Sequence, residues 1–206
     1  MSIPKTLDAN QCKALIDELF VGQGTKKQLA KSCRNVSMAH VMLETGIRVG
    51  ELCGLRVSDL WFAEQPVENL LVRAEIAKNK EERQIPISVK LHEAINIMHA
   101  ILWSAVKVAP GSYAFFAKVH GCPLTTRSVE RIILSAGKAA FNMDVTPHML
   151  RHTFASRMMR KTNARTVQAL LGHESLQSTQ IYMHPNLDDL KKAINSKDEP
   201  VDPDYR

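Results

Sequence analysis

Helical periodicity interrupted by one pair of β-type segments is the feature that most constrains the fold of this chain. Apolar residues recur at helical spacing over most of the sequence. By contrast, Asn69–Ile76 and Arg83–Ile87 contain β-type residues and flank the polar turn Lys78–Glu82. We therefore predict one β-hairpin, and a further short extended piece at Tyr113–Phe116, within a mainly helical chain. The expected fold class is α+β, mainly helical with a small antiparallel sheet.

Capping residues mark the expected helix ends. Thr146 followed by Pro147 is a strong start signal, with threonine at the N-cap and proline at the first helical position. Gly46 and Gly172 follow periodic segments and are expected to end them. The predicted helices are Thr6–Phe20 with Thr6 as cap, Lys27–Glu44, Val49–Leu55, Ser88–Val108 with Ser88 as cap, a helix capped by Thr125 or Thr126 that runs to Phe141, the helix from Pro147, Ala164–Leu171 and a tail helix Leu187–Asn195.

The composition suits one globular domain with a polyanionic partner. The 206 residues include 27 Lys and Arg against 21 Asp and Glu, a formal charge of +6, which makes nucleic acid the first candidate. No segment resembles a transmembrane span or a secretory signal, so we expect no membrane partner. Four cysteines without a CxxC pair indicate reduced thiols in a cytoplasmic protein, mostly packed in the interior: Cys12, Cys33, Cys53 and Cys122.

One helix face gathers the first candidate site residues. His148, Arg151 and His152 stand at i, i+3 and i+4, so they project together, and an arginine fork beside an imidazole suits a phosphate. The same pattern is also typical of a solvated face, or of histidines that satisfy buried carbonyls. A metal site at His148 and His152 is disfavoured because Met149 stands where a zinc protease has its glutamate.

Three further clusters are ambiguous when each is taken alone. Arg48 precedes Glu51 by three positions, which fits either an arginine held in a fixed pose or a surface ion pair. Lys78 and Lys80 lie on the predicted hairpin turn, where a basic residue is usually just solvated. Tyr182, nine residues after His173, is on its own most easily interpreted as a packed aromatic.

Taken together and in order, these clusters resemble the tyrosine recombinase and integrase family. Its signature of Arg, Lys, His-x-x-Arg, His or Trp, then Tyr matches boxes such as TGIRVGEL and PHMLRHTFAS from about residue 5 to residue 187. The matching positions are Arg48, Lys78, His148, Arg151, His173 and Tyr182. The register, counted back from Arg83 and Pro86, favours Lys78, and Lys80 is close enough to substitute.

The resemblance implies a mechanism similar to that of type IB topoisomerases. Tyr182 would attack a DNA phosphorus and form a 3′-phosphotyrosyl bond, which a second 5′-hydroxyl then reverses, with neither metal nor cofactor. Arg48, Arg151 and His173 would stabilise the phosphate charge, while His148 accepts the phenol proton. The hairpin lysine would act as the general acid that protonates the leaving 5′ oxygen. Glu51 and His152 would support the site, Glu51 by positioning Arg48.

The resemblance also implies double-stranded DNA as partner and a homo-tetramer on DNA. We expect a catalytic domain over residues 1–186 and a tail over 187–206, whose helix docks on a neighbouring protomer or on its own domain before a disordered end. Most family members carry an additional N-terminal DNA-binding domain, so the chain matches either an excised fragment or short members such as fimbrial invertases. The expected function is a site-specific recombinase (integrase, resolvase or invertase). The alternatives are a relaxing topoisomerase and a non-catalytic DNA-binding regulator.

Overall fold

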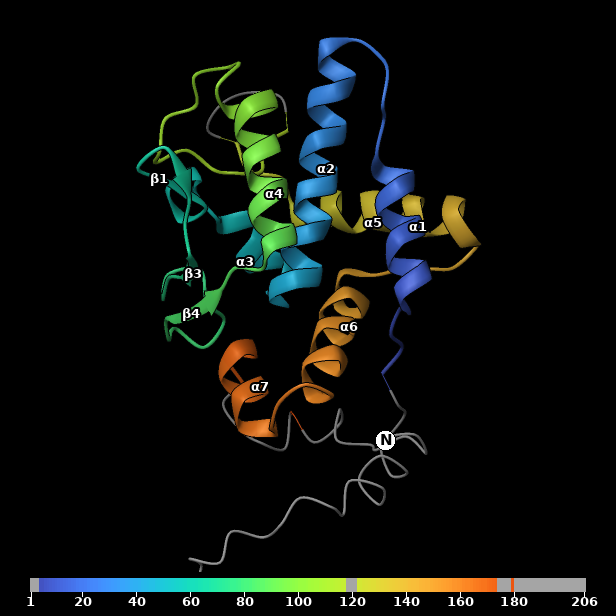
Figure 1. The fold of residues 1–206 in the computed structure, drawn as a ribbon, viewed down its shortest axis with the longest axis vertical. Helices are drawn as coiled ribbons and strands as arrows, with labels where there is room; N and C mark the ends of the chain where they lie inside the picture. Colours follow the sequence, from blue (N-terminus) through green and yellow to red (C-terminus); the bar gives the residue numbers. More distant parts are fainter. Residues whose placement is uncertain (1–3, 118–121, 174–178, 180–206) are drawn as a thin grey trace, which may run out of the picture.

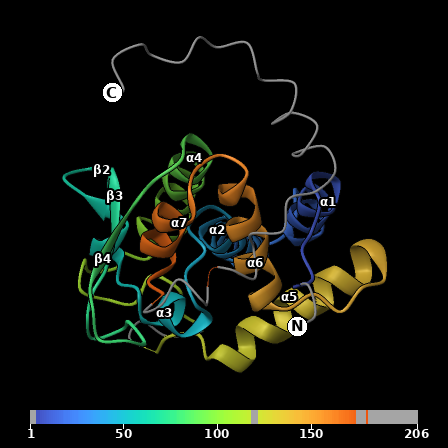
Figure 2. The ribbon, with the colours of Figure 1, turned by 90° about the horizontal axis from the view of Figure 1, so that it is seen from below.

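The computed structural model describes residues 4–117, 122–173 and 179, and helix α2 (Lys26–Thr45) lies at its centre (Figures 1 and 2). The consecutive positions 41, 42 and 43 of α2 are all buried, so the helix is covered on more than one face. Four α-helices and the π turn η2 contact it: α1 (Ala9–Leu19), α3 (Val49–Gly54), α4 (Val89–Met98), α6 (Pro147–Met159) and η2 (His99–Trp103).

The remaining elements lie around this centre. Helix α5 crosses close to α1, and α7 packs beside α6 and the second hairpin strand (Figures 1 and 2). Their bounds are η1 (Val57–Asp59), β1 (Trp61–Phe62), β2 (Gln65–Pro66), β3 (Asn69–Val72), β4 (Arg83–Pro86), α5 (Thr126–Phe141) and α7 (Ala164–Leu171). The α+β class is confirmed, with two short antiparallel ribbons in place of one small sheet.

Most predicted helix ends are confirmed by the caps that form them. Thr125 and Thr146 each accept a hydrogen bond from the backbone N–H three positions on, at 3.1 and 3.3 Å. Gly46 and Gly172 end α2 and α7 in the left-handed conformation, with φ of 63° and 60°. The expected cap at Thr6 is wrong. Helix α1 begins later because the Asp8 carboxylate accepts from the N–H of Gln11 at 2.8 Å and forms a capping box with that residue.

The hairpin is confirmed, but its first strand is shorter than predicted. Strands β3 and β4 pair antiparallel with Val72 opposite Arg83, and residues 73–82 form the connection. The strand stops at Val72 because the Arg73 side chain turns back to donate to Asp59 at 3.0 Å and to the Gly54 carbonyl at 3.1 Å. The β1–β2 ribbon was not predicted, since Ala63 and Glu64 occupy its positive-φ turn without the usual Asn-Gly signature.

The helix that starts at Ser88 is also shorter than predicted. The α-helix ends at Met98, and one wider π turn continues to Trp103 rather than to Val108. The buried Trp103 indole donates to the Ala114 carbonyl at 3.2 Å, which ties this end to the following segment. The predicted extended piece makes single antiparallel bridges, Arg56 with Tyr113 and Phe116 with Pro123.

The composition predicted mostly interior cysteines and no transmembrane span. The four cysteines are free thiols, but only Cys33 is buried; Cys12 and Cys53 are partly exposed and Cys122 is exposed, so interior packing was overestimated. Among the helices of the described ranges, none combines the length and apolar character needed to span a bilayer. The predicted tail over 187–206 lies outside the described residues.

Candidate active site

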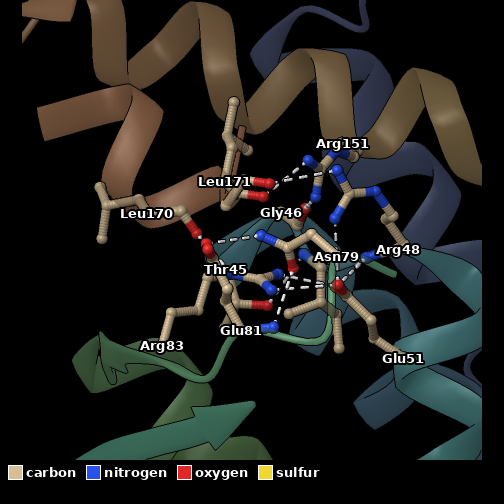
Figure 3. Close-up of polar contacts among 12 residues, drawn as sticks. Thr45, Gly46, Arg48, Glu51, Asn79, Glu81, Arg83, Arg151, Leu170 and Leu171 are labelled. Atoms are coloured by element: carbon tan, nitrogen blue, oxygen red, sulfur yellow. Dashed lines mark hydrogen bonds and ion pairs between the residues drawn. The ribbon is translucent and has the colours of Figure 1, made fainter. Parts of the chain in front are cut away.

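The candidate site lies where helix ends from distant parts of the sequence meet. The carboxyl end of α2 at Gly46, the start of α3 at Arg48 and the carboxyl end of α7 approach the face of α6 that carries Arg151 (Figure 3). The last carbonyls of a helix have no partner within it and carry the negative end of the helix dipole. Such ends are suited to hold arginine side chains.

Three successive carbonyls at the end of α7 hold three different arginines. Each guanidinium comes from a separate element: the start of α3, the first residue of β4 and the second turn of α6. The bonds run from Arg83 to Leu170 at 3.0 Å, from Arg151 to Leu171 at 2.8 Å and from Arg48 to Gly172 at 3.3 Å.

Among the predicted catalytic residues that the structure describes, Arg151 is the most deeply buried. Only 4% of it is exposed, and its guanidinium also donates to the Gly46 carbonyl. Two helix ends therefore fix the plane of the guanidinium, because each contributes a carbonyl at a defined angle. The arginine is rigidly placed before any ligand arrives.

Glu51 is almost fully buried, with 1% of its side chain exposed, and joins two of the arginines. Its carboxylate accepts from the Arg48 backbone N–H at 2.7 Å, from Arg48 Nη1 at 3.1 Å and from the Arg83 fork at 3.0 and 2.7 Å (Figure 3). Burial alone would raise the pKa of Glu51, but the bonds and charges of Arg83 and Arg48 outweigh it and lower that pKa. The lowered pKa favours the carboxylate anion, which holds both the backbone and the side chain of Arg48.

His173 follows the glycine cap of α7 and lies beside these arginines. Its Nδ1 is 3.0 Å from the hydroxyl of the buried Thr179, and the Gln168 side-chain amide donates to its backbone carbonyl at 3.0 Å. Burial, and then the positive charges of Arg151, Arg48 and Arg83, lower the pKa of His173 to about 4. The imidazole is therefore neutral at physiological pH.

The two histidines of α6 have different surroundings. His148 is exposed, and its ring centroid lies 6.4 Å from that of the half-buried His152. Burial, followed by the neighbouring His148 and Arg151, lowers the pKa of His152. Within the described part of the chain no three His, Cys, Asp or Glu side chains gather in a way that could hold a metal ion.

The hairpin turn carries both candidate lysines at the surface. Ala77 is buried in the core, and the exposed Lys78 follows it directly. Lys80 is also exposed, adopts a positive φ of 60°, and donates its backbone N–H to the Ala77 carbonyl at 3.2 Å. The turn borders a groove of about 410 Å³, whose other wall includes His173.

The structure thus gathers Arg48, Glu51, Arg151 and His173 at one point, with His148 and His152 on the adjoining face of α6. Tyr182 lies outside the described residues.

Sequence reasoning missed Arg83 as a part of the site. In the sequence, Arg83 was used only to count back to the position of the hairpin lysine. In the structure, it donates to both Glu51 and the end of α7. Thr179, the partner of His173, was missed as well. No local signal singles out either residue, because their contacts depend on segments far away in the sequence or on the path of the chain after α7.

The arrangement has the chemistry of an anion site. Three guanidinium groups converge. The Glu51 carboxylate pairs with two of them, Arg48 and Arg83, while Arg151 is bound by carbonyls. Preorganised cations of this kind stabilise charge that develops on a phosphoryl group without reorganising during the reaction. A neutral His173 beside them can donate one further hydrogen bond.

Comparisons with known proteins identify the family of the chain. Residues 5–188 match the model of the phage integrase family. Tyrosine recombinase XerC of Bacillus pumilus is 34% identical over 187 residues, which cover 88% of this chain and 58% of the relative. The XerC of Listeria monocytogenes is 35% identical over 199 residues, with coverage of 94% and 62%. The chain therefore spans less than two thirds of the length of these relatives.

Solved structures share the fold. The crystal structure of XerA recombinase has a TM-score of 0.73 at 28% identity and covers 97% of this chain and 68% of its own. The pre-cleavage complex of XerH with its difH substrate has a TM-score of 0.67 over 95% of this chain and 55% of its own. Because its sequence identity is 24%, the XerH complex shows similarity of fold alone.

Proposed function

The chain belongs to the phage integrase family, and we propose that it is a site-specific DNA recombinase that cleaves and rejoins DNA through Tyr182. The observation that carries this proposal is the convergence of Arg48 and Arg151 beside a neutral His173. The relatives named tyrosine recombinases favour recombination over simple relaxation or passive DNA binding.

The proposed reaction begins with charge stabilisation at the scissile phosphate. As the Tyr182 oxygen bonds to phosphorus, a second negative charge develops on the nonbridging oxygens. Arg48 and Arg151 would hold those oxygens, and His173 would donate a further hydrogen bond. Each preorganised donor of this kind contributes about 3–4 kcal/mol to lowering the barrier.

Two proton transfers complete each cleavage. The phenol has an ordinary pKa of about 10, so its proton needs an acceptor at neutral pH, and His148 is the proposed base. The bond from phosphorus to the 5′ oxygen breaks, and the hairpin lysine gives its proton to that oxygen. A free 5′-hydroxyl remains, and its attack on the 3′-phosphotyrosyl bond restores the phosphodiester and releases Tyr182.

Lys78 is the proposed general acid. Its backbone directly follows the buried Ala77, so its side chain starts from a point anchored to the core. Lys80 lies two residues further along the turn, in the left-handed conformation, and is attached to Ala77 through its backbone N–H. A fixed backbone position for the lysine favours accurate transfer of its proton across the adjoining groove.

The proposed partner is double-stranded DNA, bound by a homo-tetramer in the cytoplasm. The formal charge of +6 favours a polyanionic partner. Within this proposal, residues 1–186 are the catalytic domain, and the tail over 187–206 couples protomers. Mass photometry of the protein with paired sites tests the assembly: four protomers on two duplexes are expected, and monomers on DNA under conditions of recombination would contradict it.

The central experiment uses nicked duplexes with randomised sequence around the nick. After incubation, denaturing gels are examined for SDS-resistant protein–DNA adducts, and the attached DNA is sequenced to identify the preferred site. Wild-type protein should form an adduct with or without EDTA, and Tyr182→Phe should form none.

Tyr113 provides a matched control. Tyr113→Phe should retain adduct formation, since Tyr113 belongs to a backbone bridge and not to the candidate site. An adduct with Tyr182→Phe would assign the nucleophile elsewhere. A wild-type protein that binds DNA without forming any adduct would instead identify a non-catalytic regulator.

A further inference from the structure

We infer that Arg83 is a positioning residue that joins the lysine hairpin to the phosphate-binding arginines. The inference rests on the proposed function and deepens it. Arg83 is the first residue of β4, at the point where the chain leaves the hairpin turn. Its side chain is 8% exposed and crosses from the hairpin into the candidate site.

The contacts of Arg83 reach two separate parts of the site. Nη1 and Nη2 donate in parallel to the two oxygens of Glu51 at 3.0 and 2.7 Å, and Nε donates to the Leu170 carbonyl at 3.0 Å (Figure 3). The same carboxylate holds Arg48. One guanidinium therefore connects the hairpin, the start of α3 and the end of α7.

The path of the chain makes this connection relevant to the lysine. The turn that carries Lys78 is fixed at its first end by Arg73, which donates to Asp59 and to the Gly54 carbonyl. Arg83 fixes its second end. The exposed tip between them has its own bond, from the Asn79 amide to Glu81 at 3.0 Å. Without Arg83 the second end of the turn would lose its side-chain attachment to the site.

Gly172 shows how closely the two parts are fitted. A Cβ at this position would lie 3.0 Å from Arg83 Cδ and 3.1 Å from its Nη1, so the glycine cap of α7 leaves room for the arginine. His173 is the next residue, and the Arg83 charge is one of the causes that lower the pKa of His173. Displacement of Arg83 would therefore affect both the lysine hairpin and the surroundings of His173.

A purely structural role of Arg83 would also account for a buried ion pair. Cleavage of two substrates that differ in their need for a general acid distinguishes this role from the positioning of the lysine. A 5′-bridging phosphorothiolate replaces the leaving oxygen by sulfur, which departs without a general acid. We define the rescue ratio as the cleavage rate on this substrate divided by the rate on the ordinary phosphodiester. Because any inactive protein lowers both rates equally, the ratio is independent of the folded fraction.

The experiment measures the rescue ratio of the wild type, Arg83→Met, Arg83→Lys and Lys78→Met on one nicked duplex. If Arg83 positions the lysine, Arg83→Met should raise the ratio by about 10- to 100-fold, as expected for a misplaced catalytic group. Arg83→Lys keeps the charge but loses the fork, so its ratio should lie between those of Arg83→Met and the wild type. The double variant Arg83→Met with Lys78→Met should have the ratio of Lys78→Met alone.

Arg157→Met is the matched control. Arg157 also bonds one carboxylate and one carbonyl, those of Glu44 and Leu43, and within the described residues it has no hydrogen bond or ion pair to the candidate site. Its ratio should equal that of the wild type. A wild-type ratio in Arg83→Met, whatever its overall activity, overturns the inference and leaves the recombinase proposal standing. Failure of the wild type to cleave either substrate overturns both.

Discussion

Arg83 and Glu51 lie 32 positions apart in the sequence and form a forked ion pair, with Nη1–Oε1 at 3.0 Å and Nη2–Oε2 at 2.7 Å. Both side chains are buried, with 8% and 1% exposed. A buried ion pair adds little net stability to a protein, because the cost of desolvation offsets the attraction between the charges. Removal of one partner is nevertheless strongly destabilising, because the other charge remains buried without a counter-charge. The pair is therefore a sensitive point of the fold as well as of the site.

Glu51→Ala should destabilise the protein by about 3–5 kcal/mol, because Arg83 is left buried without a counter-charge. Urea unfolding followed by circular dichroism measures the change. Glu75→Ala is the control: Glu75 pairs with Arg73 at 3.6 Å but is 74% exposed, so its loss should cost less than about 1 kcal/mol. Equal effects of the two substitutions would contradict the importance assigned to burial.

Gly172→Ala should destabilise the protein by about 1–3 kcal/mol, since the residue has a φ of 60° and an added Cβ would crowd Arg83. Gly50→Ala provides the contrast, because that helical position has open space around it and should gain about 0.5–1 kcal/mol. Thermal and urea unfolding of both variants measure these changes. An unchanged free energy of unfolding in Gly172→Ala would mean that the cap of α7 can shift to make room for the added Cβ.

Stability should fall as the pH is lowered from 6.5 towards 4. The pKa of His173 is about 4 in the folded protein against an ordinary value of 6.5, so within this window the unfolded chain binds a proton that the folded chain does not. Above 6.5 this contribution is constant. His173→Gln should reduce the slope, while the half-buried His40 and His152, whose pKa values are also lowered, maintain part of it. Melting temperatures across this range test the expectation, and unchanged slopes would refute it.

Arg48→Gln should slow adduct formation by about 100- to 1000-fold, because one preorganised donor to the phosphate is lost. Arg48 is 23% exposed, so the effect on folding should be smaller than that of Glu51→Ala. Single-turnover cleavage of the selected nicked duplex, with a melting curve for each protein, separates the two effects. A loss below about tenfold would remove Arg48 from the proposed phosphate site.

Local signals in the sequence were sufficient for most of the helices. Thr125, Thr146 and the glycines at 46 and 172 act within one helical turn, so their effect does not depend on distant segments. The errors arose where distant contacts decide. The first hairpin strand ends early because Arg73 bonds to Asp59, a partner that no local pattern identifies.

The same distinction between local signals and distant contacts applies to the candidate site. The sequence by itself determined the family, the order of the arginines and histidines, and the helical face that carries His148 and Arg151, because spacing along the chain is sufficient for each. Only the tertiary structure brought Glu51, Arg83 and the end of α7 together. That arrangement depends on the approach of elements far apart in the sequence, where burial makes each charge require a partner.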